Sequence, residues 1–380
     1  MNLEELRTQI DEVDGALVEL FEKRMDISAQ IAEYKRENGL PIFQSARERE
    51  KLAAISKMAN KEEMQRYLRV LYSLLFELSR TYQGALYRSD TELYKTIRAA
   101  MDSTSKVFPK QAAVACQGVE GAYAQLACER LFSAPSIQFF RNFDGIFSAI
   151  EAGLCRYGIL PIENSTAGSV RQVYDRMLEH HFYIVRSVRL KIDHCLLAKP
   201  GTTEIHEIFS HEQAISQCAG FLKSLGKDVR VTCCENTAAA AQKVALSDRT
   251  DVAALSSRQC AELYGLQCLR YAVQDKGNNH TRFLCISKTP EIYPGADRTS
   301  IRLVLAHKPG SLYRVLARLY ALDINLLKLE SRPMPDRDFE FQFYLDLETS
   351  VYSEEFAQLM CELSGICEEF TYLGSYSEVV

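Results

Sequence analysis

The first 88 residues contain seven side chains of the types that bind a small anion. Arg24 falls on an apolar seam between Leu20 and Ile27, and Lys35 lies near Ile31. Arg24 and Lys35 are 11 residues apart, about three helical turns, so they share one face of a helix. Cations on such a seam either meet an anion or extend their charged ends to water, and the pattern leaves both readings open. The seven residues are Arg7, Arg24, Lys35, Arg47, Glu48, Ser79 and Gln83.

Two spacings within this set bear on how it could form a site. Ser79 and Gln83 are four residues apart and lie on one helix face, which is either an ordinary polar face or part of the same site. Arg7 and Arg24 are 17 residues apart, about 25 Å along a straight helix at ~1.5 Å per residue. One small ligand cannot touch both arginines within a single chain. If both act, two long helices must pair antiparallel, and the protein must be a dimer.

A second group of polar residues occurs in the middle of the chain, where apolar runs meet polar segments. Two motifs, E-N-S-T-A-G-S-V at 163–170 and T-R-F at 281–283, supply Asn164, Ser165, Thr166, Thr281, Arg282 and Phe283. Ser210 and Gln213 predict a helix-capping box, which favours a structural role for His211 between them. Ligands of α/β proteins bind where strand ends meet helix N-termini, so we expect these junctions to face a ligand.

Three kinds of structure must position these residues. Apolar residues at steps of three and four predict helices through residues 1–88, with a break at 38–41. Residues 89–111 are polar and predict a linker. Strands alternate with helices over residues 112–290, which predicts an α/β fold. Residues 299–376 predict the order βαββαβ, a ferredoxin-like α+β unit.

The composition narrows the class of protein. The 380 residues predict two to four domains at about 100–200 residues each. A net charge of −5 without a long basic run argues against nucleic-acid binding. No apolar run reaches the ~20 residues that span a bilayer, and the acidic N-terminus does not resemble a signal peptide. The 12 cysteines form no C-x-x-C pair, so we expect reduced thiols, no metal and a cytoplasmic location.

Residues 1–88 resemble the all-helical chorismate mutases in the combined spacing of the seven residues. The resemblance implies three helices in an intertwined dimer. It also implies that Arg7, Arg24 and Arg47 hold the two chorismate carboxylates, that Lys35 and Gln83 address the ether oxygen, that Glu48 addresses the hydroxyl, and that Ser79 lines the site. The family usually has Asp where this chain has Gln44, which affects one substrate contact. Fixed cations and amide donors suit a pericyclic rearrangement, which needs no base or nucleophile.

Residues 112–290 resemble prephenate dehydratases in the T-R-F motif and in P-I-E-N-S with G-S-V at 161–170. The resemblance implies two lobes with a cleft between them, similar to type II periplasmic binding proteins. Thr281 would donate a hydrogen bond to the leaving hydroxyl, and Arg282 or nearby amides would hold a carboxylate. The residues Asn164, Ser165, Thr166 and Phe283 would complete the substrate site. The family commonly has Ser at the place of Ala124.

Residues 299–376 resemble the ACT domains that follow prephenate dehydratases, through G-S-L at 310–312 and E-S-R-P at 330–333. Ser311 replaces the alanine of the first motif. The resemblance implies a phenylalanine site between paired domains, and a plain dimerisation module is the alternative. The site would contain Gly310, Ser311, Leu312, Asn325, Glu330, Ser331 and Arg332.

The three segments together predict a bifunctional enzyme of phenylalanine biosynthesis. It would convert chorismate to prephenate and prephenate to phenylpyruvate without a cofactor, as a homodimer or homotetramer inhibited by phenylalanine. The alternative is a non-catalytic or singly active ligand-binding or sensor protein, because a fold does not fix a function. The presence of the mutase cations together with Thr281 favours the enzyme.

Overall fold

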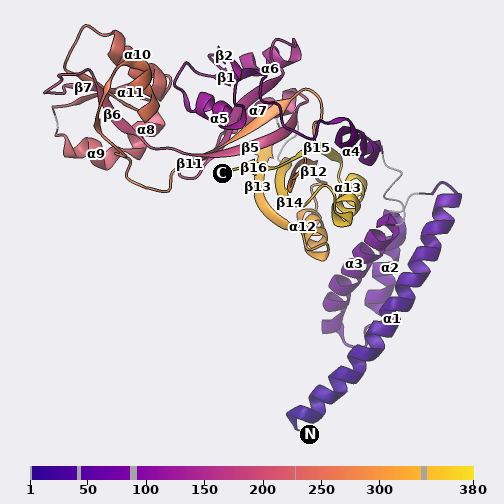
Figure 1. Cartoon of the computed structure of the whole chain (residues 1–380). Coiled ribbons are helices and arrows are strands. Elements are labelled where there is room, and N and C mark those ends of the chain that lie inside the picture. Colours follow the sequence, from indigo (N-terminus) through magenta and orange to yellow (C-terminus); the bar gives the residue numbers. More distant parts are fainter. Residues whose placement is uncertain (1, 41–43, 86–91, 227, 335–339) are drawn as a thin grey trace. The chain divides into compact units, whose positions relative to one another are not determined.

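The computed structural model describes residues 2–40, 44–85, 92–226, 228–334 and 340–380. The chain divides into two compact units (Figure 1). One contains Met1–Ala99 and Thr299–Tyr372, and the other contains Ala100–Arg298 and Leu373–Val380. The chain therefore passes from the first unit into the second twice.

Three helices form the N-terminal part of the first unit, as the apolar spacing predicts: α1 (Leu3–Glu37), α2 (Ser45–Lys57) and α3 (Glu62–Ala85). A capping box between Asn2 and Glu5 begins α1, and Asn38 ends it before Gly39, whose φ is 63°. The predicted break at Pro41 lies outside the described residues. Both α1 and α2 pack against α3.

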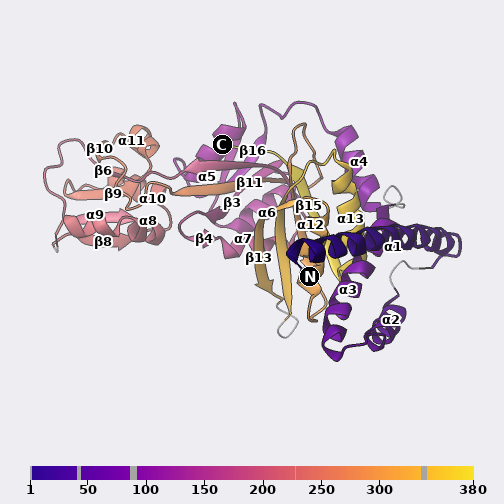
Figure 2. The same cartoon turned by 90° about the horizontal axis from the view of Figure 1, so that it is seen from below.

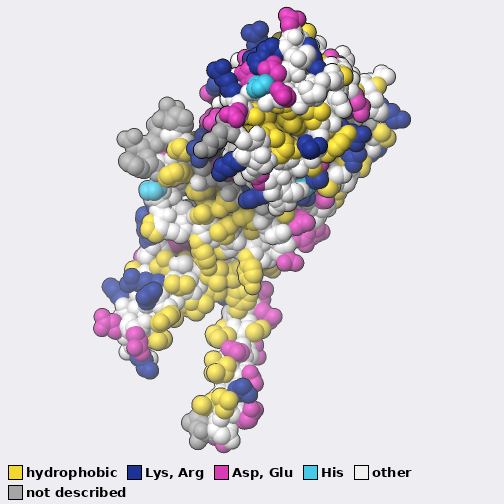
Figure 3. Space-filling model, turned by 90° about the vertical axis from the view of Figure 1, so that its left-hand side faces the viewer, with side chains coloured by type: hydrophobic (Ala, Val, Ile, Leu, Met, Phe, Trp, Pro, Cys, Tyr) yellow, Lys and Arg dark blue, Asp and Glu magenta, His cyan; other side chains and the backbone are white. Residues whose placement is uncertain are grey.

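The apolar stripe of α1 is exposed in the single chain, although its pattern predicts a stripe that faces a core. Leu3, Ile10 and Leu20 are 62%, 60% and 64% exposed, and hydrophobic side chains run along this helix in Figure 3. The buried residues of α1, which are Met25, Ser28 and Ala32, all lie toward its C-terminal end. A helix of 35 residues is about 50 Å long. The 24 residues of α3 cannot cover that length.

The remainder of the first unit is a four-stranded sheet with two helices. Its elements are β12 (Arg298–Val304), α12 (Ser311–Ala321), β13 (Asn325–Pro333), β14 (Phe341–Glu348), α13 (Glu354–Ile366) and β15 (Glu369–Tyr376). The strand order β13-β14-β12-β15 is that of a ferredoxin-like βαββαβ fold, as predicted. Helix α13 also packs against α3, so the two ends of the chain share this unit.

The second unit folds into two lobes, each around a sheet with parallel and antiparallel pairs (Figure 2). The first sheet has the order β16-β5-β11-β3-β1-β2, with β4 beside β3, and the second has the order β10-β6-β9-β7-β8. Figure 2 shows β11 leading from the lobe of the second sheet into the other lobe. The predicted alternation of strands and helices is confirmed.

The strands of this unit are β1 (Ala113–Gln117), β2 (Ser136–Phe140), β3 (Tyr157–Asn164), β4 (Gly168–Ser169), β5 (Tyr183–Lys191), β6 (Cys195–Ala198), β7 (Glu207–Ser210), β8 (Arg230–Cys233), β9 (Val252–Ser256), β10 (Gln267–Arg270), β11 (His280–Ser287) and β16 (Glu378–Val379). The helices are α5 (Tyr123–Leu131), α6 (Phe143–Glu151), α7 (Arg171–Glu179), α8 (Glu212–Gln217), α9 (Ala219–Ser224), α10 (Thr237–Leu246) and α11 (Arg258–Tyr264). The predicted linker contains a further helix, α4 (Glu92–Ser103).

The end of the chain adds a strand to the first sheet of the two-lobed unit. β16 pairs in parallel with β5, and Glu378, only 2% exposed at its side chain, lies 2.6 Å from Arg189 and 3.0 Å from Arg298. Gly374 has a φ of 137°, and a Cβ there would meet the carbonyl oxygen of Ile184 at 2.2 Å. Only glycine permits this approach. Deleting everything after β11 would therefore remove part of this sheet as well as the βαββαβ fold.

No helix within the described ranges is long and apolar enough to cross a membrane.

Candidate active sites

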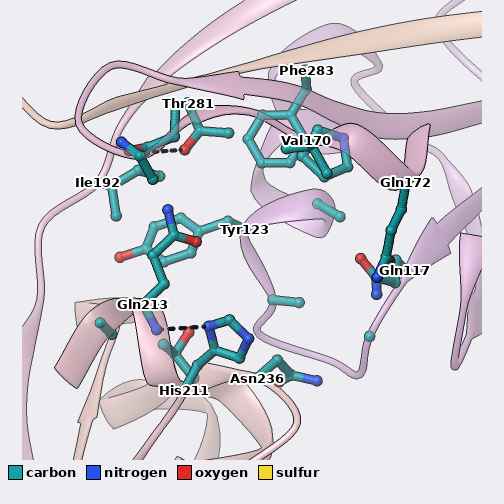
Figure 4. Close-up of a pocket in the computed structure, with 18 of the residues that line it drawn as sticks. Gln117, Tyr123, Val170, Gln172, Ile192, His211, Gln213, Asn236, Thr281 and Phe283 are labelled. Carbon is teal, nitrogen blue, oxygen red and sulfur yellow. Dashed lines mark hydrogen bonds between the residues drawn. The ribbon is translucent and has the colours of Figure 1, made fainter. Parts of the chain in front are cut away.

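A cavity of about 570 Å³ lies between the two lobes of the second unit. Figure 4 shows Thr281 and Phe283 entering it from β11, with His211 and Gln213 of the α8 segment opposite and Tyr123 between them. The cavity therefore brings together the T-R-F motif and residues of the other lobe. Within the described part of the chain, no group of three or more His, Cys, Asp or Glu residues could hold a metal ion.

The alternation of β11 decides which part of the T-R-F motif reaches the cavity. Successive side chains of a strand point to opposite faces, so Thr281 and Phe283 line the cavity and Arg282 does not. Arg282 is 6% exposed and forms an ion pair with Glu163 at 2.7 Å. The structure thus contradicts the prediction that Arg282 reaches a substrate carboxylate in this cavity.

Asn164 fixes the hydroxyl of Thr281. Its Nδ2 donates to Thr281 Oγ1 at 2.9 Å and to Asn279 Oδ1 at 2.8 Å. Its Oδ1 accepts from the backbone N–H groups of Thr166 and Ala167, each at 3.0 Å. Among the described residues, the hydroxyl proton of Thr281 has no protein acceptor. That proton is therefore available to a ligand in the cavity.

Three further residues that sequence reasoning missed extend this network. Gln217 Oε1 accepts from Asn279 Nδ2 and from the ring nitrogen Nε2 of His194, both at 2.9 Å. Because Asn279 already fixes Gln217 Oε1 as an acceptor, His194 must carry its proton on Nε2. His194 is 2% exposed, and burial lowers its pKa despite the opposing effects of Gln217 and Asp193. Hence the histidine is neutral near pH 7. The adjacency of Gln213 and Gln217 on one helix face was the available sequence signal.

The two hydroxyl residues after Asn164 differ in their surroundings. Ser165 donates to the carbonyl of Asn278 at 2.8 Å and accepts from the N–H of His280 at 2.9 Å, so it closes the loop beside β11 and lies outside the cavity lining. The Oγ1 of Thr166 accepts from Gln217 Nε2 at 2.8 Å. Thr166 lines an adjoining cavity of about 440 Å³.

Helix N-termini surround the larger cavity. It is lined by the first residues of α5, α7, α8 and α10, and Arg171 at the start of α7 adds a cation. N-terminal N–H groups favour anions, so their convergence gives the cavity a positive potential at those points. Asn236 caps α10 by accepting from Ala239 N–H at 2.7 Å. Ala124 also lines the cavity, which leaves that position without a hydroxyl.

The start of α8 differs from the predicted capping box. His211, not Ser210, is the N-cap, and its Nδ1 accepts from Gln213 N–H at 3.3 Å. Ser210 is fully buried at the end of β7 and donates to the carbonyl of Leu255 at 2.8 Å. The strand continues one residue further than the motif suggested, which places the imidazole at the cavity.

A second candidate site lies among the three N-terminal helices. Arg24 donates to Ser79 Oγ and, at 3.2 Å, to the carbonyl of Leu75, and its guanidinium lies 5.7 Å from the ring centre of Phe76. Burial lowers the pKa of Arg24. Among the described residues, Arg24 has no carboxylate partner. A half-buried cation with only neutral partners is a binding point for an anion.

Lys35, Glu48 and Gln83 lie on the same side of this bundle. Burial lowers the pKa of Lys35, while Glu48 opposes that effect and Arg80 adds to it. Glu48 pairs with Arg80, a buried arginine that sequence reasoning missed although it is three residues from Gln83 on the same face. The Oε1 of Gln83 is buried with no hydrogen-bond partner in the described residues.

Three other predicted residues of this site lie apart in the single chain. Arg7 pairs with Glu4 at 2.9 Å, and Arg47 lies 3.6 Å from Glu50; both arginine side chains are exposed. Gln44 is the N-cap of α2 without a side-chain capping bond. One chain therefore assembles only part of the predicted set.

The predicted sensor motifs occur in the βαββαβ fold. Gly310, with a φ of 83°, is the N-cap of α12, and Ser311 and Leu312 begin that helix. Asn325 starts the edge strand β13 and donates to Glu348 at 2.9 Å. Glu330, Ser331 and Arg332 lie near the other end of β13, with their side chains alternating between its two faces.

Two family models match the chain over these sites. Residues 114–291 match prephenate dehydratase, and residues 6–84 match chorismate mutase type II. Arogenate dehydratase/prephenate dehydratase 2 of Arabidopsis thaliana is 37% identical over 277 residues, which are 69% of this chain and 72% of that protein. The bifunctional chorismate mutase/prephenate dehydratase of Escherichia coli is 29% identical over 98% of this chain and 95% of its own.

Two solved structures share the fold over 70% of this chain. Prephenate dehydratase of Arthrobacter aurescens in complex with L-Phe has a TM-score of 0.64 at 25% identity and is covered over 89% of its length. A protein described as a novel type of quorum quenching acylase has a TM-score of 0.64 at 31% identity and is covered over 97%. The helical site and the cleft site define an enzyme with two separate reaction centres. The chain belongs to the prephenate dehydratase family and carries a chorismate mutase domain ahead of the dehydratase.

The buried His194 predicts a pH dependence of stability. Its pKa in the folded chain lies below the ordinary value of 6.5, so unfolding takes up a proton when the pH falls below about 6.5. The free energy of unfolding should then decrease with falling pH, by at most about 1.4 kcal/mol per pH unit from this group. Denaturant unfolding at pH 7.5, 6.5 and 5.5 measures this slope. His194→Asn should flatten it, and the exposed control His181→Asn should not; equal slopes in parent and His194→Asn would contradict the prediction.

Proposed function

We propose that the chain catalyses two successive reactions, the rearrangement of chorismate to prephenate on α1, α2 and α3 and the conversion of prephenate to phenylpyruvate in the two-lobed unit. The observation that carries the second reaction is the hydroxyl of Thr281, held by Asn164 with its proton available to the cavity. Following prephenate and phenylpyruvate separately after addition of chorismate tests both reactions. A binding protein would produce neither, and a singly active enzyme would form prephenate without phenylpyruvate or act only on added prephenate.

The mutase reaction uses charge rather than acid–base chemistry. Arg24 binds a chorismate carboxylate, since its protein partners are neutral. Lys35 and Gln83 stabilise the negative charge that develops on the ether oxygen, and Glu48 accepts the substrate hydroxyl. Ser79 orients Arg24. Arg47 and Gln44 close on the substrate from the start of α2, where Gln44 in place of an acid removes one charged contact.

Arg7 enters the site from a second copy of the chain. Within one chain it lies about 25 Å from Arg24 along α1. The exposed stripe of Leu3, Ile10 and Leu20 supplies the apolar surface for an antiparallel pairing of two such helices. Burying that stripe accounts for a hydrophobic pattern that the single chain leaves in water. The enzyme is therefore at least a dimer through α1.

Mixing two inactive variants tests the shared site. Arg7→Ala and Arg24→Ala should each lose mutase activity while retaining the dehydration of added prephenate. In a mixed dimer, one site receives Arg7 from one chain and Arg24 from the other, so it is complete. Unfolding and refolding the two variants together should restore part of the mutase activity. A mixture that stays as inactive as its components would rule out a site built from two chains.

The dehydratase reaction needs orientation of the ring and help for the leaving hydroxyl. As the bond to the ring carboxylate breaks, its electrons complete the aromatic ring, carbon dioxide leaves, and the hydroxyl departs with a proton as water. Thr281 donates the hydrogen bond that supports this departure. Phe283 packs beside the ring, and Asn164 holds Thr281 in the donating orientation.

Arg171 and the helix N-termini bind the prephenate carboxylates in place of Arg282. The guanidinium of Arg282 is neutralised by Glu163 on the far face of β11, so it supports the sheet. Arg171 lies at the cavity together with the N-terminal turns of four helices. Ser165 and Thr166 shape the loop after β3 rather than contact the leaving group.

Removing the hydroxyl of Thr281 should stop the second reaction without affecting the first. Thr281→Ala lowers dehydratase turnover by about 10²–10⁴-fold, because one positioned proton donor is lost, and prephenate accumulates from chorismate. Thr281→Ser keeps the hydroxyl and serves as the matched control, with much of the activity retained. If Thr281→Ala turned over prephenate as fast as Thr281→Ser, the hydroxyl would have no part in the mechanism.

The βαββαβ fold is an ACT domain that binds phenylalanine and inhibits the dehydratase. Gly310 at the start of α12 lets a ligand approach the backbone, and the buried Ser311 Oγ has no hydrogen-bond partner among the described residues. The bound ligand lies between Gly310, Ser311 and Leu312 and the segment of Asn325, Glu330, Ser331 and Arg332 on β13. The prephenate dehydratase of Arthrobacter aurescens forms a complex with L-Phe, which supports this choice of ligand.

Phenylalanine binding should be reciprocal with substrate binding. An inhibitor acts only if it binds one conformation of the enzyme better than another, so prephenate must weaken phenylalanine binding by the same factor by which phenylalanine weakens prephenate binding. Calorimetric titration of phenylalanine into the full chain, with and without a prephenate analogue, measures both factors. Tyrosine is the control ligand. Tighter binding of tyrosine would assign the sensor to another amino acid.

A further inference from the structure

A buried network of ion pairs runs from the mutase site to the βαββαβ fold within the first unit. Arg80 on α3 pairs with Glu48 of α2 and with Glu77 one turn earlier on α3. The other oxygen of Glu77 lies 2.5 Å from Arg318 on α12, and Arg318 lies 3.4 Å from Glu362 on α13. The network therefore joins four helices that are far apart in sequence.

Burial makes each member of this network depend on the others. Glu77, Arg80, Arg318 and Glu362 are 7%, 8%, 2% and 7% exposed. Removing one partner from a buried ion pair leaves an uncompensated charge, so the remaining groups must rearrange. Burial tends to lower the pKa of Arg80, but Glu48 and Glu77 outweigh that effect and raise it. Arg80 is thus a fixed cation between two carboxylates.

The contacts around Arg80 continue onto α13. Thr81, the next residue of α3, donates to Glu362 at 2.9 Å, and Gln358 donates to the other oxygen of Glu362 at 2.8 Å. A Cβ at Gly84 would lie 3.4 Å from Glu362 Cγ, so the two helices are close at this point. The segment of α3 that carries Ser79 and Gln83 is therefore in direct contact with α13.

We propose that Arg80 is a positioning residue of the mutase, and that Arg318 holds it in place through Glu77, so that the βαββαβ fold completes the mutase site. Arg80 does not touch the substrate; it sets the position of the Glu48 carboxylate. The inference rests on the proposed role of Glu48. A shift of a reacting group by about 1 Å can lower a rate on the order of 10²-fold.

The test uses the full chain and measures both activities in each variant. Arg80→Met and Arg318→Met remove the charge while keeping an unbranched apolar side chain. The expected loss in mutase kcat/KM is about 10–100-fold for the first and about tenfold for the second, with dehydration of added prephenate unchanged. Arg80→Lys should recover part of the loss. Arg66→Met, an exposed arginine on α3, is the matched control and should behave as the parent.

A double-mutant comparison separates positioning from mere support of the fold. Glu48→Gln should by itself lower mutase kcat/KM, and adding Arg80→Met or Arg318→Met to it should cause little further loss, because they act through the same carboxylate. If either Met variant fails to fold, Glu362→Gln, which keeps the size of the side chain, replaces it and should give a smaller loss of the same kind. Unchanged mutase activity in Arg80→Met or Arg318→Met overturns the proposal, as does an undiminished loss in the Glu48→Gln background. If Glu48→Gln alone is as active as the parent, the proposed role of Glu48 fails first.

Discussion

A charge that leaves water needs a partner of opposite sign, and this requirement decides which arginines of the chain can bind a substrate. Arg282, Arg80 and Arg318 are nearly fully buried, and each is paired with a carboxylate of the protein. Arg24 is half-buried with neutral partners, and Arg171 lies at the cavity. The paired arginines support the fold, whereas the other two remain available to anionic substrates.

The same need for partners operates in the cleft through neutral groups. Asn164 donates to Thr281 and to Asn279, Asn279 donates to Gln217, and His194 donates to the same oxygen of Gln217. Each donor and acceptor is assigned by its neighbour, so the direction of the Thr281 proton follows from a chain of hydrogen bonds. A neutral His194 is part of that assignment, and burial maintains it.

The path of the chain connects the units more closely than a series of separate domains would. Residues 373–380 leave the βαββαβ fold and add β16 to the first sheet of the dehydratase, where Glu378 lies between Arg189 and Arg298. β5, which receives this strand, also pairs with β11, the strand that carries Thr281. At the other end, α13 packs against α3 beside Ser79 and Gln83. Both catalytic parts therefore contact elements of the C-terminal segment.

The sequence by itself determined the features that depend on local periodicity. The steps of three and four residues gave the three N-terminal helices, and the strand–helix alternation gave the α/β unit and the βαββαβ order. The T-R-F and E-N-S motifs led to Thr281 and Asn164. Tertiary structure alone decided that Arg282 turns to Glu163, that His211 rather than Ser210 caps α8, and that Arg80 meets Glu48 and Glu77. These outcomes depend on the face of a strand, on its final residue and on partners up to 32 residues away along the chain, or farther still for Arg318, and a pattern of neighbouring residues does not contain that information.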